Sequence, residues 1–299
     1  MKVELQIYNL TKRYNNFVAL DNVSLSVNQG DIYGLIGRNG AGKTTFFKCV
    51  MGLAKITGGS VEIAGQKRHL DAARRQIGFM INPSFFPYLS AKQNLEYLAR
   101  VKGVHAADEV DRLLKMVGLH GVKKPFKAFS LGMKQRLGIA GALLGQPSIV
   151  VLDEPINGLD PEGIADMRRV IKDTNQQHGT TFIISSHILS ELDLVATRFG
   201  FLEAGVLIKD ITHRDLHEHT KKSLLIEVND PAKAKRLLKT KLNIAATNSN
   251  NQLFVKSHLD EPDKVAKILV DGGVKLYKLQ HQETTLEGYF MQLIGGHHA

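Results

Sequence analysis

The stretch "GLIGRNGAGKTTF", residues 34–46, fits the pattern G-x-x-x-x-G-K-[ST], with Gly37, Gly42, Lys43 and Thr44 in register. In such a loop, backbone N–H groups surround phosphates, the lysine adds positive charge, and the hydroxyl faces Mg²⁺. An apolar strand-like run precedes the loop and a helical run follows it, which is the order that the motif requires. We therefore predict a nucleotide phosphate site rather than an incidental glycine-rich turn. The residues expected to bind the nucleotide here are Gly37, Arg38, Asn39, Gly40, Ala41, Gly42, Lys43, Thr44 and Thr45.

Length and composition limit the kinds of protein this chain can be. With 299 residues, of which 43% are hydrophobic and 23% charged, the composition is globular and the length suggests about two domains. No apolar run approaches the ~18 residues of a membrane span, and the beginning of the chain lacks a signal-peptide pattern. The one cysteine, Cys49, excludes an internal disulfide and fits a cytosolic protein. Lys and Arg exceed Asp and Glu by 39 to 29, but no basic cluster is interleaved with aromatics, so we expect no nucleic-acid partner.

Apolar runs and helical periods outline an α/β domain. Residues 148–155 and 181–187 resemble buried strands, and the helix expected between them has Pro161 in its first turn and Gly179 just beyond its end. This alternation predicts a parallel sheet covered on both faces. Residues 88–145 hold helical stretches only, which predicts an inserted helical subdomain at about 83–145. A strand hairpin is expected around Ala204-Gly205.

The pattern of the chain changes after about residue 217. The order strand, helix, strand, strand, helix, strand is typical of a ferredoxin-like α+β domain, and a last helix follows it. We therefore predict one domain at 1–217 and a second at 218–299. The second carries no recognisable catalytic cluster, so we expect an accessory or regulatory module.

Carboxylates and a histidine follow the two buried strands. Asp153 and Glu154 end the first strand, at the sheet edge where ligands bind in α/β proteins. Asp153 can hold Mg²⁺, and Glu154 can polarise a water for attack on the γ-phosphate. His187 ends the second strand, where it can contact the γ-phosphate. Tyr14, upstream of the phosphate loop, offers an aromatic face on which adenine can stack.

The stretch "FSLGMKQRLGIAGALL", residues 129–144, indicates the family. Its "SLGMKQR" resembles the signature motif of ATP-binding-cassette (ABC) proteins, usually written L-S-G-G-Q. With "GRNGAGKTT", "VVLDEPINGLDP" and "SSH", the order and spacing over residues 1–215 resemble an ABC nucleotide-binding domain. The resemblance implies ATP and Mg²⁺ as cofactors, ATP hydrolysis, and a mixed sheet with a helical subdomain.

The resemblance also implies roles for particular residues. Ser130 and Gly132 would bind the γ-phosphate held by a second subunit, and Asp160 would lie at the interface of a head-to-tail homodimer that encloses two ATP molecules. Elementary physics agrees, because Ser130 precedes a helix whose N-terminus attracts anions. Asn82 stands where the family normally has Gln, so the resemblance implies that Asn82 contacts Mg²⁺. Because Asn is one methylene shorter, this contact needs a movement of the loop. Leu131 and Met133 replace the usual Gly and Gln.

The whole pattern resembles the ATPase subunits of bacitracin- and lantibiotic-resistance exporters. It implies a separately encoded membrane subunit and export of an antimicrobial peptide, an antibiotic or another amphipathic substrate. The loop "INPSFFPYLSAKQN", residues 81–94, corresponds to the family's groove for a short helix of that subunit. Four bulky residues, Phe85, Phe86, Pro87 and Tyr88, cannot all face inward from an irregular segment, so some should be exposed and bind the partner.

Two other function classes stay open at this point. A soluble ABC ATPase that acts on ribosomes or DNA generally has two cassettes or a coiled-coil insertion, and this sequence has one phosphate loop and no such insertion. A P-loop kinase or small NTPase would not need "SLGMKQ" or His187. We therefore predict the energy-coupling ATPase of a membrane transporter, held peripherally at the cytoplasmic face of the cell membrane.

Overall fold

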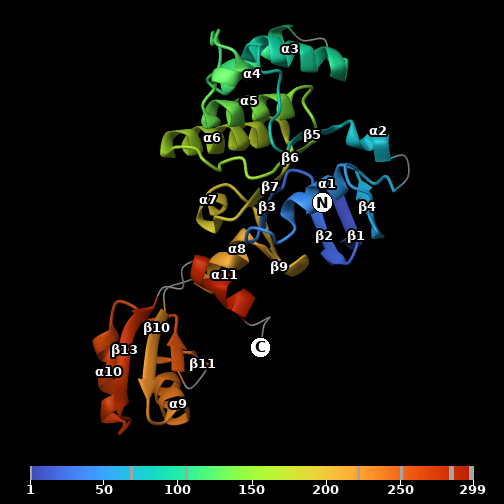
Figure 1. Cartoon of the computed structure of the whole chain (residues 1–299). Coiled ribbons are helices and arrows are strands. Elements are labelled where there is room, and N and C mark those ends of the chain that lie inside the picture. The colour runs from blue at the N-terminus through green and yellow to red at the C-terminus, as the bar shows by residue number, and fades with distance from the viewer. Residues whose placement is uncertain are drawn as a thin grey trace. The chain divides into compact units, whose positions relative to one another are not determined.

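The computed structural model describes residues 2–67, 70–104, 107–220, 223–249, 252–282 and 286–295. The chain forms two compact units, residues 1–213 and residues 214–299. Each unit is described by itself below (Figure 1).

The first unit is built around a six-stranded sheet with the strand order β5-β6-β7-β3-β8-β9. These strands are β5 (Ile77–Met80), β6 (Ile149–Leu152), β7 (Thr181–Ser186), β3 (Ile32–Ile36), β8 (Arg198–Glu203) and β9 (Val206–Thr212). All neighbours are parallel except β8 and β9, which form the expected hairpin around Ala204 and Gly205. Every residue of β3, β6 and β7 is buried, because helices and a second sheet cover the faces of this sheet.

A second, antiparallel sheet packs on the first through one helix. Its strands are β2 (Phe17–Asn28), β1 (Val3–Tyr14) and β4 (Gly58–Ile63), in that spatial order, and α2 (Leu70–Arg74) follows β4. Helix α1 (Lys43–Val50) contributes Phe46, Phe47 and Cys49 to a core that also contains Leu35 of β3 and Leu5 of β1. The phosphate loop therefore connects a central strand to a helix that is buried between two sheets.

Further helices cover the six-stranded sheet or gather at one end of the unit. The helical subdomain contains α3 (Ala91–Lys102), α4 (Ala107–Met116), the 3₁₀ turn η1 (Phe126–Ala128) and α5 (Leu131–Leu143) (Figure 1). Helices α6 (Pro161–His178) and α7 (Leu189–Asp193) flank β7 in sequence and contact it. Helix α6 has Pro161 at its start and ends at Gly179, whose φ of 65° is left-handed, as the sequence predicted.

The second unit has its own sheet and core. Helix α8 (His213–Thr220) leads into it, and β10 (Ser223–Val228), α9 (Pro231–Leu242), β11 (Ala246–Ser249), β12 (Gln252–Val255), α10 (Pro262–Asp271), β13 (Leu276–Gln282) and α11 (Leu286–Gly295) follow. The strand order β11-β12-β10-β13 is that of a split βαβ domain. Alternate residues of β10, namely Leu224, Ile226 and Val228, join one aliphatic cluster with residues of α9 and α10.

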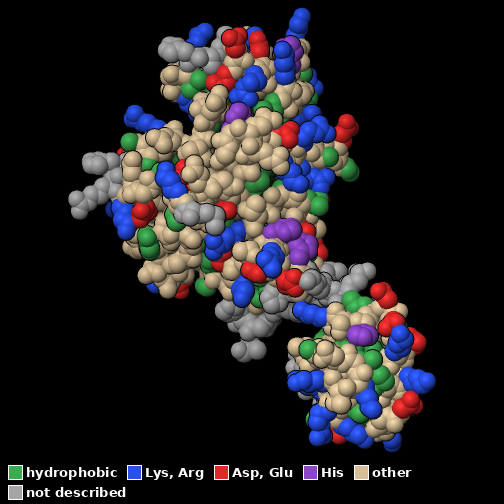
Figure 2. All heavy atoms as spheres, turned by 180° about the vertical axis from the view of Figure 1, so that it is seen from behind, with side chains coloured by type: hydrophobic (Ala, Val, Ile, Leu, Met, Phe, Trp, Pro, Cys, Tyr) green, Lys and Arg blue, Asp and Glu red, His purple; other side chains and the backbone are tan. Residues whose placement is uncertain are grey.

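Charged side chains lie on the surfaces of both units. Lys and Arg side chains lie in separate small groups among Asp and Glu, on the face that Figure 2 shows. Among the helices described, none is both long enough and apolar enough to span a bilayer.

Candidate nucleotide-hydrolysis site

The phosphate loop between β3 and α1 has a backbone that needs glycine. Gly42 precedes α1 with a φ of 109°, and a Cβ at this position would lie 2.8 Å from the carbonyl oxygen of Ala19. Both the conformation and the space therefore exclude a side chain. The N–H of Gly37 donates to the carbonyl of Ser186 at 3.3 Å, which ties the beginning of the loop to β7. The positions of the remaining loop residues differ in exposure: Arg38, Asn39 and Gly40 are exposed, Ala41 is buried, and Thr44 and Thr45 are half-buried.

Lys43 is the buried cation of the site. Its side chain is only 6% exposed, and its ammonium donates to the carbonyls of Gly37 at 2.6 Å and Arg38 at 3.2 Å. The same ammonium lies 3.1 Å from Oε1 of Glu154, with which it forms an ion pair. A buried charge is tolerated only when it is paired and hydrogen-bonded, and Lys43 meets both conditions.

Asp153 and Thr44 bring two oxygen atoms together beside this pair. The Thr44 hydroxyl donates to Oδ2 of Asp153 at 2.6 Å, and the hydroxyl of Ser185 donates to Oδ1 of Asp153, also at 2.6 Å. Mg²⁺ prefers carboxylate and hydroxyl oxygens and usually binds one or two protein ligands together with substrate phosphates. The Thr44 and Asp153 oxygens therefore fit that ion, next to the loop that would hold the phosphates.

Glu154 and His187 meet across the ends of neighbouring strands. Oε2 of Glu154 lies 2.8 Å from Nδ1 of His187, so that the carboxylate bridges His187 and Lys43. Glu154 has a φ of 49°, an uncommon value for a residue other than glycine. The structure thus brings together the predicted residues Lys43, Thr44, Asp153, Glu154 and His187.

The signature residues lie at an exposed helix end. Ser130 is the N-cap of α5, and its hydroxyl accepts a hydrogen bond from the N–H of Met133 at 3.3 Å. Leu131, which stands where the family has Gly, is 53% exposed and packs against Gly158, since a Cβ on that glycine would lie 2.3 Å from a Leu131 methyl. Gly132 is half-buried. An open helix N-terminus of this kind can receive an anion.

Asp160 has a structural task that the sequence analysis missed. Its carboxylate is the N-cap of α6 and accepts a hydrogen bond from the N–H of Gly163 at 3.0 Å. The signal was present in the sequence, since Asp followed by Pro is a typical helix start. Asp160 is nevertheless exposed, so the cap leaves it accessible to a second subunit.

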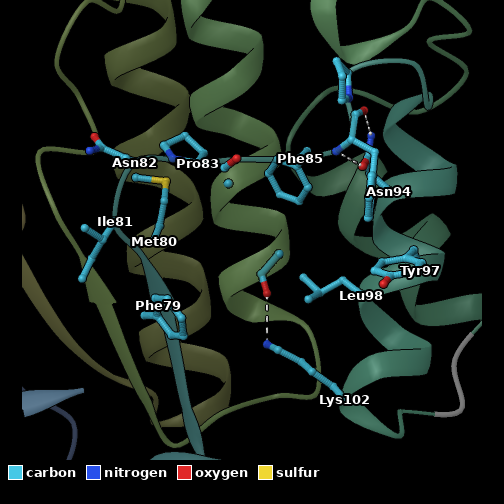
Figure 3. Close-up of a pocket in the computed structure, with 15 residues that line it drawn as sticks. Phe79, Met80, Ile81, Asn82, Pro83, Phe85, Asn94, Tyr97, Leu98 and Lys102 are labelled. Carbon is cyan, nitrogen blue, oxygen red and sulfur yellow. Dashed lines mark hydrogen bonds between the residues drawn. The ribbon is translucent and has the colours of Figure 1, made fainter. Parts of the chain in front are cut away.

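Two of the predicted site residues, Tyr14 and Asn82, make no hydrogen bond or ion pair with the central cluster among the described residues. Tyr14 ends β1 with 45% of its side chain exposed, and the ammonium of Lys12 lies 4.3 Å from its ring centroid. Asn82 is exposed with a φ of 50°, and its side chain points away from Phe85 and Tyr97 (Figure 3). Among the described residues, no hydrogen bond or ion pair joins Tyr14 to the phosphate loop or Asn82 to Asp153, and their roles stay predictions.

A groove of about 530 Å³ opens between the loop at 81–87 and helices α3 and α5. Phe86 is 48% exposed, and its ring meets that of Tyr97 edge-on with the centroids 4.7 Å apart. Phe85 is instead half-buried against Phe126, at a centroid distance of 5.4 Å, and lies between the helices (Figure 3). The loop therefore keeps one phenylalanine inside and presents the other at the surface of the groove.

Asn94 and Lys102 hold the walls of this groove. The Asn94 side chain, 1% exposed, accepts from the N–H of Phe86 at 2.8 Å and donates to the carbonyl of Phe86 at 3.2 Å. Lys102 donates to the carbonyl of Gly141 in α5 (Figure 3). It also donates to the carbonyl of Leu144, which follows the helix. Burial of its ammonium lowers the pKa of Lys102.

Comparison with known proteins places this site in a family. The family model "ABC transporter" matches residues 20–157. Over 99% of both chains, the sequence is 40% identical to the bacitracin transport ATP-binding protein BcrA of Bacillus licheniformis. It is 43% identical to the lantibiotic transport ATP-binding protein SrtF of Streptococcus pyogenes, over 68% of this chain and 89% of that one.

Solved structures agree with this placement. A dimeric, post-hydrolysis structure of the ATP-binding cassette MJ0796 bound to ADP and Pi matches with a TM-score of 0.65 and 27% identity, over 70% of this chain and 99% of that one. The predicted fold class and family resemblance are thereby confirmed. The chain belongs to the ABC transporter family, as an ATP-binding subunit that hydrolyses ATP.

Proposed function

We propose that this subunit powers the export of an antimicrobial peptide or antibiotic through a separately encoded membrane subunit, at the cytoplasmic face of the membrane. The proposal that this site hydrolyses ATP rests on one observation: Glu154 bridges Lys43 and His187. Asp153 and Thr44 lie next to this bridge. The names of the bacitracin and lantibiotic transport relatives support the substrate class. They offer no support for the alternative of an ABC ATPase that acts on ribosomes or DNA.

The ion pair between Lys43 and Glu154 suggests how the site responds to ATP. The β- and γ-phosphates carry more negative charge than one carboxylate, so they compete with Glu154 for the ammonium of Lys43. Glu154 then has Oε1 available to accept the proton of an attacking water, while His187 faces the γ-phosphate. Mg²⁺, bound by Thr44 and Asp153, would supply charge neutralisation at the β- and γ-oxygens.

A second copy of the chain would complete the site. Ser130, Gly132 and Asp160 are all at least partly accessible, and the N-terminus of α5 offers N–H donors to a phosphate. The solved structures of MJ0796 are dimeric, which supports a dimer of this chain. The dimer that we propose is head-to-tail, so that each signature loop meets the ATP of the other copy.

Replacing Glu154 tests the catalytic proposal. In Glu154→Gln the amide cannot accept the proton of the water, so we expect ATP hydrolysis to fall by about 10²–10⁴-fold. ATP binding, measured by calorimetry, should persist. Glu162→Gln removes an exposed carboxylate from the first turn of α6 and should leave the rate of phosphate release unchanged. If Glu154→Gln releases phosphate as fast as the unaltered protein does, Glu154 is not the general base.

A further inference from the structure

Ser185 lies at the end of β7 and is completely buried. The parallel register of β6 and β7 pairs Leu152 with Ile184, and one further step in that register would place Asp153 opposite Ser185. The regular ladder ends here, because β6 stops at Leu152. The side chain of Ser185 therefore stands beside the two residues that carry the chemistry.

One hydroxyl makes two hydrogen bonds at this point. The Ser185 Oγ donates to Oδ1 of Asp153 at 2.6 Å and accepts from the backbone N–H of Glu154 at 2.9 Å. A serine hydroxyl has one hydrogen to donate and two lone pairs to accept with, so both bonds can exist together. A hydrogen bond to a carboxylate is also about twice as strong as one between neutral groups.

The first bond orients Asp153. With Oδ1 held by Ser185, the other oxygen, Oδ2, faces the Thr44 hydroxyl 2.6 Å away. Without the first bond, the carboxylate is free to turn about its χ2 torsion, which has broad energy wells. Hydrogen bonds of this kind, from groups that support a metal ligand, typically contribute 10–100-fold to metal affinity or activity.

The second bond supports the backbone of Glu154. This residue combines a φ of 49° with a proline, Pro155, immediately after it. A non-glycine residue rarely adopts such a φ, and a following proline restricts its backbone further. A backbone in this state persists only where neighbouring groups hold it, and the Ser185 hydroxyl bonds its N–H.

A buried serine hydroxyl can be satisfied without bonding to the residues of the site. Ser186, the next residue, is equally buried, and its hydroxyl accepts from the backbone N–H of Ile188. Among the described residues, that hydroxyl makes no hydrogen bond to Asp153 or Glu154. At this end of β7, the bonds to Asp153 and Glu154 are therefore particular to Ser185.

We infer that Ser185 is a positioning residue for ATP hydrolysis, which orients the metal-binding carboxylate of Asp153 and holds the backbone that carries Glu154. This inference rests on the roles proposed above for those two residues. Ser185 itself contacts neither phosphate nor metal in this arrangement. It acts through its neighbours.

The test compares Ser185→Ala with Thr181→Val. Thr181 is equally buried on the same strand, at the opposite end, where its hydroxyl accepts from the N–H of Gly30. Each variant loses one buried hydroxyl, so both report the same kind of stability loss. Only Ser185→Ala should lower kcat and raise the Mg²⁺ concentration needed for half-saturation, each by about 10–100-fold.

A binding measurement supplies a readout besides activity. A fluorescent ATP analogue is titrated onto each variant without divalent ions, and the complex is then titrated with Mg²⁺. Ser185→Ala should bind the analogue normally in the first step, because Lys43 and the phosphate loop are intact, and should need about 10–100-fold more Mg²⁺ in the second. Unchanged Mg²⁺ titration and kcat in a folded Ser185→Ala protein would overturn the inference.

A cysteine variant separates hydrogen bonding from volume. Ser185→Cys keeps a side chain of similar size but bonds weakly, so it should behave like Ser185→Ala. A cysteine variant with the Mg²⁺ titration and kcat of the unaltered protein would mean that the site needs only the volume, and would also overturn the inference. Glu154→Gln is measured alongside: if it hydrolyses ATP normally, the proposed site itself is wrong, whereas loss in Glu154→Gln with normal Ser185→Ala refutes only the role of Ser185.

Discussion

At the scale of single residues, one carboxylate in the site pairs with two other side chains. Glu154 is bonded to both Lys43 and His187, so the lysine has no unpaired charge in the interior of the protein. Removing one member of such a buried pair costs more than the pair contributes, because the remaining charge is left without compensation. If the phosphates of ATP replace the Glu154 carboxylate at Lys43, the ammonium stays paired and that cost is avoided. The carboxylate and the phosphates would therefore compete for Lys43.

Cys49 provides a residue-scale prediction. It is fully buried on α1, and burial raises the pKa of its thiol, so thiolate forms only at higher pH than in an exposed cysteine. We expect Ellman's reagent at pH 8 to label the native protein far more slowly than the protein in urea. Because the chain has one cysteine, the denatured protein should show one label per chain. Equal labelling rates in the two states would contradict the burial of α1.

Spaced motifs in the sequence predicted several residues that the structure places close together. Lys43, Asp153, Glu154 and His187 each follow a strand or glycine loop in a recognisable order, and the structure brings them into contact. Ser185 lies in the quoted "SSH" but received no role, because a serine in an apolar strand carries no signal of its own until the neighbouring strand is placed beside it. That neighbour, β6, lies about thirty residues earlier, and only the register of the sheet reveals the pairing.

At the scale of elements, β5 and α5 pack unusually closely. A Cβ at Gly78 in β5 would lie 1.8 Å from the carbonyl oxygen of Ala142 in α5. A Cβ at Gly138 in α5 would lie 2.5 Å from the sulfur of Met80, at the end of the same strand. The helix that presents the signature loop is therefore in direct contact with the strand that leads into the groove.

Gly78→Ala tests this contact. The added methyl has no space between backbone atoms, so we expect a loss of about 1–3 kcal/mol or more in the free energy of unfolding of the first unit. Gly58→Ala, in β4, is the matched control, since its Cβ would find its nearest neighbour at an ordinary 3.6 Å. Thermal unfolding followed by circular dichroism should show a lower midpoint for Gly78→Ala only. Equal midpoints for both variants would mean that β5 and α5 lie farther apart.

The same elements show where sequence patterns are sufficient and where they fail. Strands β6 and β7 were predicted because each is a continuous apolar run, and α6 because proline and glycine mark its ends. Strands β4 and β5 were not predicted. The first begins with two glycines, which leaves only residues 60–63 to alternate between polar and apolar. The second has four residues with a glycine inside and an exposed Phe79, so both patterns are too short to predict a strand.

At the scale of the whole molecule, the two units have separate cores. The aliphatic cluster of the second unit draws on its own residues, from Leu224 to Val274. The proposed nucleotide site draws on residues of the first unit, from Gly37 to His187. The accessory or regulatory role of residues 218–299 therefore stays a prediction, and the coupling of ATP hydrolysis to transport is best sought on the first unit.

We expect the membrane subunit to dock in the groove of the first unit, between the loop at 81–87 and helices α3 and α5. Its loop leaves β5, whose last residue, Met80, accepts a hydrogen bond from the N–H of Asp153 at 2.9 Å. A change at the Asp153–Glu154 segment therefore reaches the loop through one backbone bond. Asn94 fixes Phe86 on both its N–H and its carbonyl, so the exposed ring is presented by a rigid support. Rigid aromatic anchors of this kind often dominate the free energy of an interface.

Phe86→Asp should therefore weaken assembly with the membrane subunit. Loss of an aromatic anchor typically costs at least ~2 kcal/mol, or about 30-fold in affinity, and a carboxylate in an apolar groove adds a desolvation cost. Tyr88→Asp is the matched control, because Tyr88 is 76% exposed in the same loop but does not line the groove. ATPase activity of the isolated protein should survive both changes. Pull-down of the membrane subunit from detergent extract should fall for Phe86→Asp only, and equal recovery by both variants would place the docking surface elsewhere.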